Sequence, residues 1–492
     1  MATTTTAPDA GRVRRLRLGP AALRRPLAIA AIAVGVVLVE VVVARGLTGP
    51  QSVRLLALVA AVAGMALAFR FPLAVAIALL VIAGSLFHSA YFTWSVGPVQ
   101  LHLEEIVLLA LGVVAVVAPK RQTWGGAAGL ALAAFLAIAT FCAWLGVQDG
   151  RVAVDDAFNW ARPFAFYGIF WIVLRLFPDA RSLRRLLIAG LVCGAITGVL
   201  ALVMQFTGSL TDVFQGSGGQ QIYTQATQAG LGGLKRIRQP GLAFSYILFW
   251  WSIVAALTWR GRFRMLMWAL VTASALNIVL SFNRNMWVGV LVGLGLVLIL
   301  GGVRLRHRLL VGLAIGLTGV VLLFTAVVNS GNTQRLDPIV ERAATVVTPR
   351  QIGEESSLRD RANETAQAWR TVKANPVFGV GAGADYGVRF NHEEGNGIWV
   401  NTTQRFLHNQ WLWLLLVGGV PALVAFAAFL GVVLAKAWGP GRTVSQTALG
   451  AGIAMICLSA FVMPYLGVEE FCLAIGVVAG AIVASRDLAR RA

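Results

Sequence analysis

Long apolar runs separated by short polar connections dominate the chain from residue 27 to residue 485. Apolar runs of about 18 residues or more are long enough to cross a bilayer as α-helices. The pattern predicts such segments at residues 27–45, 54–70, 72–90, 103–118, 126–146, 163–177, 185–206, 241–259, 264–282, 285–302, 308–329, 411–436, 445–464 and 468–485. Several are short, and merging or re-entry of neighbours would leave twelve spans. We therefore predict an all-α polytopic membrane protein with 12–14 transmembrane helices.

The same pattern divides the chain into five parts. A polar, arginine-rich tail covers residues 1–26, and the apolar run after it is too long for a typical signal peptide. A transmembrane bundle of about eleven helices covers residues 27–329. A large polar loop domain covers residues 330–410, and C-terminal transmembrane helices at 411–485 precede a short tail at 486–492.

One stretch of the large loop has helical periodicity. The sequence "SSLRDRANETAQAWRTVKANP" predicts an amphipathic helix with Ser356 or Ser357 as its N-cap. Asn375-Pro376 is expected to end it, because proline disfavours helical backbone in the residue before it.

The distribution of basic residues predicts the orientation in the membrane. More than half of the 41 Lys and Arg residues lie in the two tails and in alternate connections. Cytoplasmic loops carry an excess of Lys and Arg in membrane proteins. Both termini are therefore predicted to be cytoplasmic, and the loop at 330–410 to be extracytoplasmic. The net charge of +20 then indicates contacts with membrane lipids and no nucleic acid.

Arginines on the predicted outer side are informative, because the charge bias disfavours them there. Arg284 lies between two apolar segments in "LSFNRNMWVGVLVGL", where a charge is costly unless it snorkels or binds a partner. Arg238 precedes another apolar segment in "KRIRQPGLAFSY". Guanidinium groups match phosphate oxygens in a two-pronged geometry, so these residues are candidates for an anion site. The alternatives are a snorkelling arginine at 284 and a solvated one at 238.

His408 and Asn409 stand directly before the apolar run "QWLWLLLVGGVPALVAFAAFL". An imidazole at the membrane surface can take up a proton near neutral pH, as a general base does, although a lone histidine is more often structural. The motif "GVGAG" at 379–383 lacks the strand–turn–helix context of a nucleotide-binding loop, so we interpret it as tight turns. The sequence has no DxD-like or clustered His/Asp pattern, and we predict neither a metal site nor a cofactor.

The outward motifs together resemble the O-antigen ligase/O-antigen polymerase superfamily of bacterial membrane glycosyltransferases. The matching stretches follow the family's order: "RQPGLAFSY", "LSFNRNMWVGVLV", "LRDRANETAQAWRTVKANPVFGVGAG" and "LHNQWLWLLLVGGVPALVAFAAFL". The resemblance covers roughly residues 230–435. The family often has Ser or Thr directly before the hairpin arginine, where this chain has Asn283. The fold that the resemblance implies is a GT-C-like membrane glycosyltransferase architecture.

The resemblance also implies roles for particular residues. Arg238 and Arg284 would bind the diphosphate of a polyprenyl-diphosphate-linked oligosaccharide, such as an undecaprenyl diphosphate donor. Arg359 or Arg361 would lie near that donor, and Asn409 would contact it. His408 would activate the acceptor hydroxyl or contact the donor, so that His408 and Arg284 form the expected catalytic pair.

The function implied is an inverting, metal-independent glycosyltransferase on the outer face of the bacterial cytoplasmic (inner) membrane. Its partners would be the lipid-linked donor, a glycan or lipid acceptor, and membrane lipids. A polymerase of surface polysaccharide is preferred, and an O-antigen-type ligase onto a lipid or protein acceptor is the alternative. Two other classes stay open: a flippase for lipid-linked oligosaccharides, and a non-catalytic scaffold of envelope synthesis. A transporter usually has charges at mid-membrane and often internal repeats, and the sequence has no evident repeat.

Overall fold

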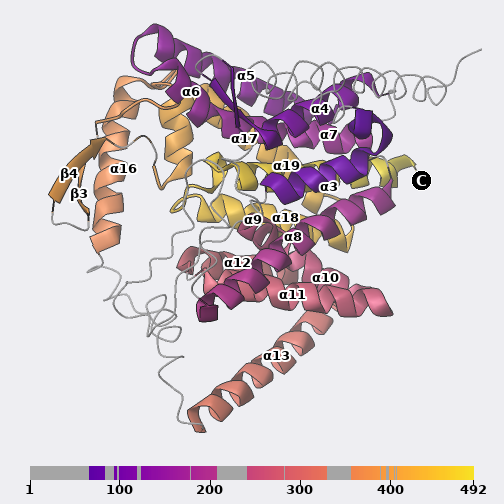
Figure 1. Ribbon diagram of the computed structural model, residues 1–492. Helices are drawn as coiled ribbons and strands as arrows, with labels where there is room; N and C mark the ends of the chain where they lie inside the picture. Colours follow the sequence, from indigo (N-terminus) through magenta and orange to yellow (C-terminus); the bar gives the residue numbers. More distant parts are fainter. Residues whose placement is uncertain are drawn as a thin grey trace, which may run out of the picture. The chain divides into compact units, whose positions relative to one another are not determined.

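A computed structural model describes residues 66–83, 93–96, 99–118, 124–177, 179–207, 241–281, 283–329, 356–387, 389–394, 398–403, 405 and 407–491 (Figure 1). The chain divides into two compact units, residues 1–72 and 73–492. In the first unit the described part is residues 66–72, of which 66–70 are helical. The predicted tail at 1–26, the predicted span at 27–45 and Arg238 lie outside the described residues.

Helices make up nearly all of the described second unit, which confirms an all-α polytopic membrane protein. The longer apolar helices follow the predicted segments closely. They are α3 (Pro72–Ala83), α4 (Leu103–Val117), α5 (Ala127–Gln148), α8 (Ala180–Thr207), α10 (Phe249–Thr258), α11 (Arg262–Leu280), α12 (Arg284–Leu300), α13 (Val303–Asn329), α17 (Gln410–Trp438), α18 (Val444–Ser459) and α19 (Glu469–Arg491).

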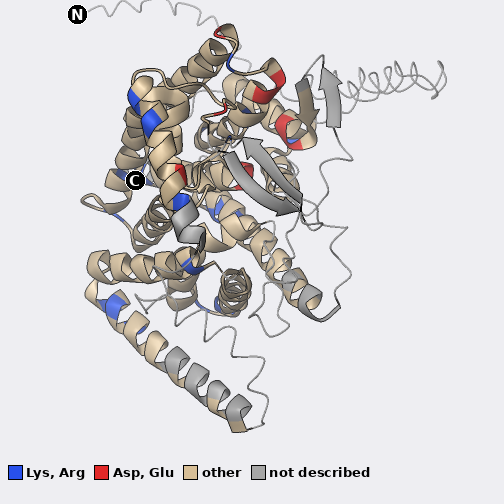
Figure 2. Cartoon of the chain, turned by 90° about the vertical axis from the view of Figure 1, so that its left-hand side faces the viewer, with Lys and Arg blue, Asp and Glu red and all other residues tan. Residues whose placement is uncertain are grey.

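Four of the described helices, α5, α8, α11 and α17, are long and apolar enough to cross a membrane. Four others, α3, α10, α12 and α18, are apolar but have 10–17 residues. The number of membrane crossings therefore stays a prediction. Figure 2 shows how few charged positions interrupt the uncharged ribbon.

Three predicted spans are interrupted. The segment at 163–177 begins as a 3₁₀ helix, η2 (Arg162–Gly168), after a short helix α6 (Val154–Ala161), and continues as α7 (Ile169–Leu176). Pro163 lies in the first turn of η2. The segment at 241–259 divides at Leu248 into α9 (Leu242–Ile247) and α10. In α17, Gly419 has φ 65° and ψ −171°, two residues before Pro421. A proline ring removes a helical hydrogen bond, and a φ near +65° favours glycine.

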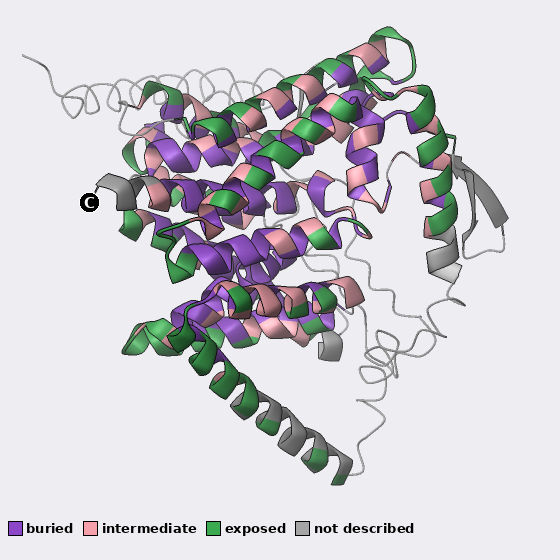
Figure 3. Ribbon diagram, turned by 180° about the vertical axis from the view of Figure 1, so that it is seen from behind, coloured by how far each residue is buried: buried purple, intermediate pink, exposed green. Residues whose placement is uncertain are grey.

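The core centres on α19, in which every residue from Phe471 to Ala484 is buried (Figure 3). Gly476 and Gly480 face η2 and α7. A Cβ atom at these positions would lie 2.5 Å from Ile169 Cγ2 and 2.9 Å from Val173 Cβ, respectively. Small residues at such spacing let two helices approach closely, which is how helices associate in membranes.

Two antiparallel hairpins are present that the apolar pattern did not predict. Strand β1 (Thr93–Val96) pairs with β2 (Val99–His102), and β3 (Arg389–Glu394) pairs with β4 (Ile398–Thr403). In the second hairpin Glu394 pairs with Ile398. The sequence "GNG" stands between them, and Asn-Gly is the strongest short-range signal for a hairpin.

The predicted amphipathic helix of the large loop is confirmed as α16 (Ser356–Ala374). Its buried positions, Glu364, Ala368 and Val372, recur every four residues and therefore form one stripe. Ala368 and Val372 are apolar, as expected for a buried stripe, but Glu364 is an acid. Helix α16 packs on α17, and this acid is buried on α16.

A glycine-rich loop at residues 375–387 follows α16 and forms hydrogen bonds with α17 at the break in that helix. The Val380 N–H donates to the Leu416 carbonyl at 2.8 Å, and the Val420 N–H donates to the Pro376 carbonyl at 3.1 Å. The three glycines of "GVGAG" have φ values of 67°, 88° and 88°, which confirms the interpretation as tight turns. The loop thus pairs with the part of α17 where Gly419 interrupts the helix.

Candidate functional site

His408 precedes the start of α17 and contacts a carboxylate from α16. Its Nδ1 atom lies 2.9 Å from Oε2 of Glu364. The Glu364 side chain is 2% exposed and that of His408 is 30% exposed. An imidazole at the surface therefore has a buried acid behind it, an arrangement that can orient the ring.

A tyrosine contacts the other oxygen of this carboxylate. The buried Tyr386 hydroxyl lies 3.5 Å from Oε1 of Glu364 and donates to it. Burial, followed by the charge of the Glu364 carboxylate, raises the pKa of the Tyr386 hydroxyl well above its ordinary value. The phenol therefore keeps its hydrogen near neutral pH, and both carboxylate oxygens have a polar partner.

Asn409, a predicted substrate contact, also has a local role. Its Oδ1 accepts a hydrogen bond from the Leu412 N–H at 3.1 Å, which makes it the N-cap of α17. The next residue, Gln410, donates its backbone N–H to the Ala460 carbonyl at 2.8 Å. These bonds fix the start of α17 against the end of α18 and thereby fix the backbone beside His408.

Arg284 is the first residue of α12, and Asn283 is its N-cap residue. The Asn283 side chain does not cap the helix; its Nδ2 donates to the Tyr465 hydroxyl at 2.5 Å. The first N–H groups of a helix carry a partial positive charge when no side chain satisfies them. A guanidinium and a helix N-terminus therefore coincide at the start of α12.

The starts of α12 and α17 both attach to the end of α18, at adjacent residues. Ser459 Oγ donates to the Asn285 carbonyl at 3.4 Å, and the Ala460 carbonyl accepts from the Gln410 N–H. Arg284 is one residue from the first attachment, and His408 is two residues from the second. The structure thus brings these two predicted residues to the same end of the helix bundle.

Helix α9 also contacts the end of α18, because the Tyr246 hydroxyl lies 2.8 Å from Ser459 Oγ. The Gly241 N–H, at the N-cap of α9, donates to Glu470 Oε2 of α19 at 2.9 Å. Arg238 stands three residues before Gly241 in the sequence, outside the described part.

Arg359 and Arg361 both belong to α16. Arg361 is half-buried and lies three residues before Glu364, so the two are neighbours along the helix. The side chain of Arg359 lies outside the description.

Arg405 is a residue that the sequence analysis missed. Its guanidinium forms ion pairs with Asp156 of α6 and with Asp385, the latter through Nε at 3.1 Å. Its carbonyl accepts a hydrogen bond from Trp413 Nε1 at 3.3 Å. Arg405 therefore ties α6, the glycine-rich loop and α17 together.

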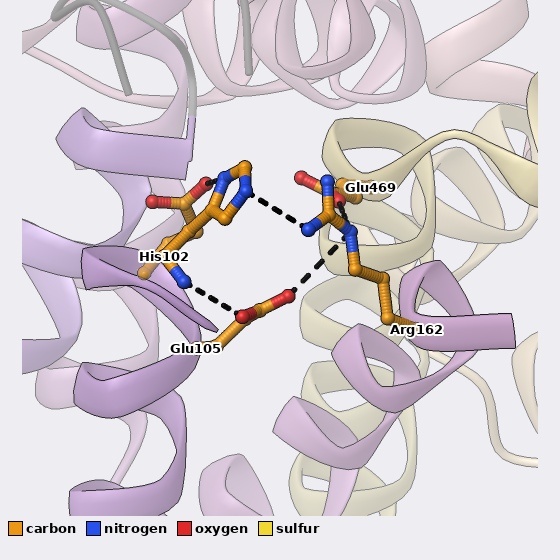
Figure 4. Close-up of polar contacts among 5 residues, drawn as sticks. His102, Glu105, Arg162 and Glu469 are labelled. Atoms are coloured by element: carbon orange, nitrogen blue, oxygen red, sulfur yellow. Dashed lines mark hydrogen bonds and ion pairs between the residues drawn. The ribbon is translucent and has the colours of Figure 1, made fainter. Parts of the chain in front are cut away.

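A second polar cluster, also missed, surrounds Arg162 at the start of η2 (Figure 4). Its Nε lies 3.2 Å from Glu469 Oε1 and 3.6 Å from Glu105 Oε1. Its NH1 lies 2.9 Å from His102 Nε2. Arginine has only donors, so His102 Nε2 accepts, and the ring hydrogen belongs on Nδ1, 3.4 Å from Glu104 Oε1. The cluster joins α4, η2 and α19.

The composition of this Arg162 cluster makes it sensitive to substitution. Three carboxylates face one guanidinium and one imidazole whose Nε2 accepts from that guanidinium. The Glu104 side chain is 1% exposed, and neither of its oxygens accepts a hydrogen bond within the described part of the chain. The sequence signal was "LEEIV" and "VEEFC", two acids in the first turn of an apolar helix each time.

We predict that Arg162→Met lowers the stability of the protein by about 3–5 kcal/mol, because removal of one partner leaves buried charges uncompensated. Adding Glu469→Gln should restore part of the loss. Thermal unfolding with a thiol-reactive dye measures the effect, since Cys142, Cys193 and Cys472 are buried cysteines.

Arg151→Met is the matched control for this prediction. Arg151 pairs with Asp149 at 3.3 Å, but their side chains are 42% and 52% exposed. Exposed pairs contribute about 0–1 kcal/mol, so this variant should unfold close to the wild-type temperature. An Arg162→Met variant that unfolds at the same temperature as Arg151→Met would contradict the prediction.

Comparison with known proteins identifies one family. Residues 268–427 match the family model described as O-Antigen ligase. No curated protein matches the chain. The match confirms the resemblance seen in the sequence and indicates a membrane glycosyltransferase-like function in surface polysaccharide synthesis.

The matched stretch runs from α11 into α17. It includes Arg284, His408 and Asn409, together with the arginines of α16 and Glu364. Arg238 precedes it, and so does Arg162. The family match therefore covers the His408–Glu364 pair and leaves the Arg162 cluster outside.

Proposed function

We propose that this chain, a member of the O-antigen ligase/O-antigen polymerase superfamily through its domain at residues 268–427, transfers glycan from a polyprenyl-diphosphate-linked donor to a hydroxyl acceptor. The reaction takes place on the outer side of the bacterial inner membrane. The observation that carries the proposal is the adjacent attachment of α12 and α17 to Ser459 and Ala460. It supports one site that combines Arg284 with His408.

The start of α12 fits a diphosphate. Its N-cap side chain is engaged by Tyr465, so the first N–H groups and the Arg284 guanidinium offer positive charge in the same place. Helix N-termini and arginines are common sites for phosphate groups. Positive charge held beside the leaving diphosphate stabilises the transition state, because negative charge grows there as the bond to the sugar breaks.

The face of α12 below Arg284 fits the lipid part of the donor. Val288, Leu291 and Ile299 are exposed, and positions four, seven and fifteen residues after Arg284 share its side of the helix. The opposite face, with Met286, is buried. An amphiphile with an anionic head and an isoprenoid tail matches a cationic helix start followed by an apolar stripe.

His408 is proposed as the general base. It takes the proton from the acceptor hydroxyl while the acceptor oxygen attacks the anomeric carbon from the side opposite the diphosphate. The bond between that carbon and the diphosphate oxygen breaks, and the polyprenyl diphosphate leaves with the electron pair. Configuration at the carbon inverts. A positioned base contributes about 10²–10⁴-fold to such a step.

We favour a polymerase, in which the acceptor is the sugar hydroxyl of a second lipid-linked repeat unit. A ligase differs only in the acceptor, which is then a lipid or a protein. The same Arg284 and His408 chemistry serves both, so the acceptor used in the assay distinguishes them.

The test supplies purified protein in nanodiscs with a polyprenyl-diphosphate-linked oligosaccharide and a chelator. We expect longer glycan chains together with released polyprenyl diphosphate, at amounts that match. His408→Ala should reduce the product to background.

Two results would overturn the proposal. One is that the folded protein consumes no donor. The other is movement of intact lipid-linked sugar across proteoliposomes with no new glycosidic bond, which is the signature of a flippase.

A further inference from the structure

Both oxygens of the buried Glu364 carboxylate have a partner, and the partners differ in what they can do. Tyr386 contacts Oε1 with a hydroxyl whose raised pKa keeps it a donor. His408 contacts Oε2 through Nδ1 at 2.9 Å. An ionised carboxylate can only accept hydrogen bonds, so the hydrogen between His408 and Glu364 belongs on Nδ1.

We infer that Glu364 is the positioning residue for His408, which fixes the ring with its hydrogen on Nδ1 and makes Nε2 the basic nitrogen. The inference rests on the proposed function and adds to it the residue that controls the base. It uses the logic of other base–acid pairs, in which a buried carboxylate orients an imidazole and stabilises the cation that forms.

The burial pattern supports a functional reason for the acid. Glu364 occupies the first position of the stripe that Ala368 and Val372 continue at intervals of four. An acid in the contact face of a helix costs free energy unless its polar atoms are satisfied. Here Tyr386 and His408 satisfy them, and an apolar residue at 364 would pack without needing either.

The origin of Glu364 adds a conformational consequence. His408 precedes α17, whereas Glu364 belongs to α16, a helix of the large loop. The base is therefore complete only when α16 lies against α17. The large loop therefore supplies the residue that orients the base.

The test compares Glu364→Gln with the wild type in the glycan-extension assay. Gln has nearly the same shape, but it carries no charge, and its NH2 group can donate to Nδ1, which would place the ring hydrogen on Nε2. We expect kcat to fall about 10²-fold or more with KM nearly unchanged, since a wrongly oriented base loses about 10⁴-fold in a comparable pair. Glu364→Asp, which retains the charge, should recover part of the rate.

The split between kcat and KM, together with the recovery by Glu364→Asp, separates positioning from a merely structural role. Arg370→Gln is the matched control, because Arg370 is exposed on the same helix and its loss should change neither kcat nor KM.

Failure of this inference can be distinguished from failure of the proposed function. If the wild type extends glycan and His408→Ala does not, while Glu364→Gln retains the wild-type kcat, the inference is wrong and the proposed function stands. The inference also fails if Glu364→Gln lowers activity only in proportion to lost folded protein, measured by thermal unfolding. A wild type that makes no new bond refutes the proposed function itself.

Discussion

Arg284→Ala is expected to lower kcat for glycan transfer about 10²–10³-fold, because one fixed donor of positive charge at the leaving group is lost. The helix start would remain, since Asn283 and its bond to Tyr465 do not depend on the arginine side chain. The kcat of Arg284→Lys should lie between those of the wild type and Arg284→Ala, because an ammonium keeps the charge but loses the planar, two-pronged contact with phosphate. Steady-state rates with the lipid-linked donor measure both variants.

Arg262→Ala provides the matched comparison for Arg284→Ala. Arg262 is likewise the first residue of an apolar helix, α11, but it lies at the far end of that helix from the turn that leads into α12. Its guanidinium stands 5.5 Å from the centre of the Phe263 ring. Equal rates for Arg262→Ala and Arg284→Ala would refute a specific role for Arg284 at the leaving group.

Gly419→Ala is expected to displace the glycine-rich loop and to abolish activity. At φ 65° and ψ −171°, a non-glycine residue costs about 1–3 kcal/mol in backbone strain alone. The added Cβ would also lie 1.9 Å from the Val377 carbonyl oxygen, which is backbone and cannot rotate away. The Val420–Pro376 hydrogen bond would then be lost with the loop contact. Thermal unfolding and glycan extension measure the effect.

Gly387→Ala isolates the contribution of backbone strain. Gly387 has φ 85°, and a Cβ there meets no atom within 4 Å. Its variant should therefore lose stability through the positive φ only and should keep most of its activity. If Gly419→Ala behaves like Gly387→Ala, contact with the loop is not what requires glycine at 419.

The membrane helices and α16 could be predicted because their signals are local. An apolar run or a four-residue periodicity is complete within one segment, as is the Asn375-Pro376 stop, after which α16 ends at Ala374. The interruptions were harder to predict. Gly419 and Pro421 were visible in the sequence, but whether a glycine bends a helix depends on what packs against it, here the Val377 carbonyl.

The acid behind His408 could not be found from one sequence. Glu364 and His408 are 44 residues apart, and an acid in an amphipathic helix looks like an ordinary solvated charge. The same holds for Arg162 and Glu469, which belong to two elements far apart in the sequence, η2 and α19. Asn409, which the family resemblance suggests for substrate, also caps its own helix through Leu412, and the substrate contact stays a prediction. Contacts between distant segments decide such cases.

Attachment of two helix starts to neighbouring residues of α18 has a mechanical consequence. Because Ser459 and Ala460 are consecutive, any tilt or axial shift of α18 moves both partners in concert. The backbone beside Arg284 and the backbone beside His408 would then keep their spacing whenever α18 shifts.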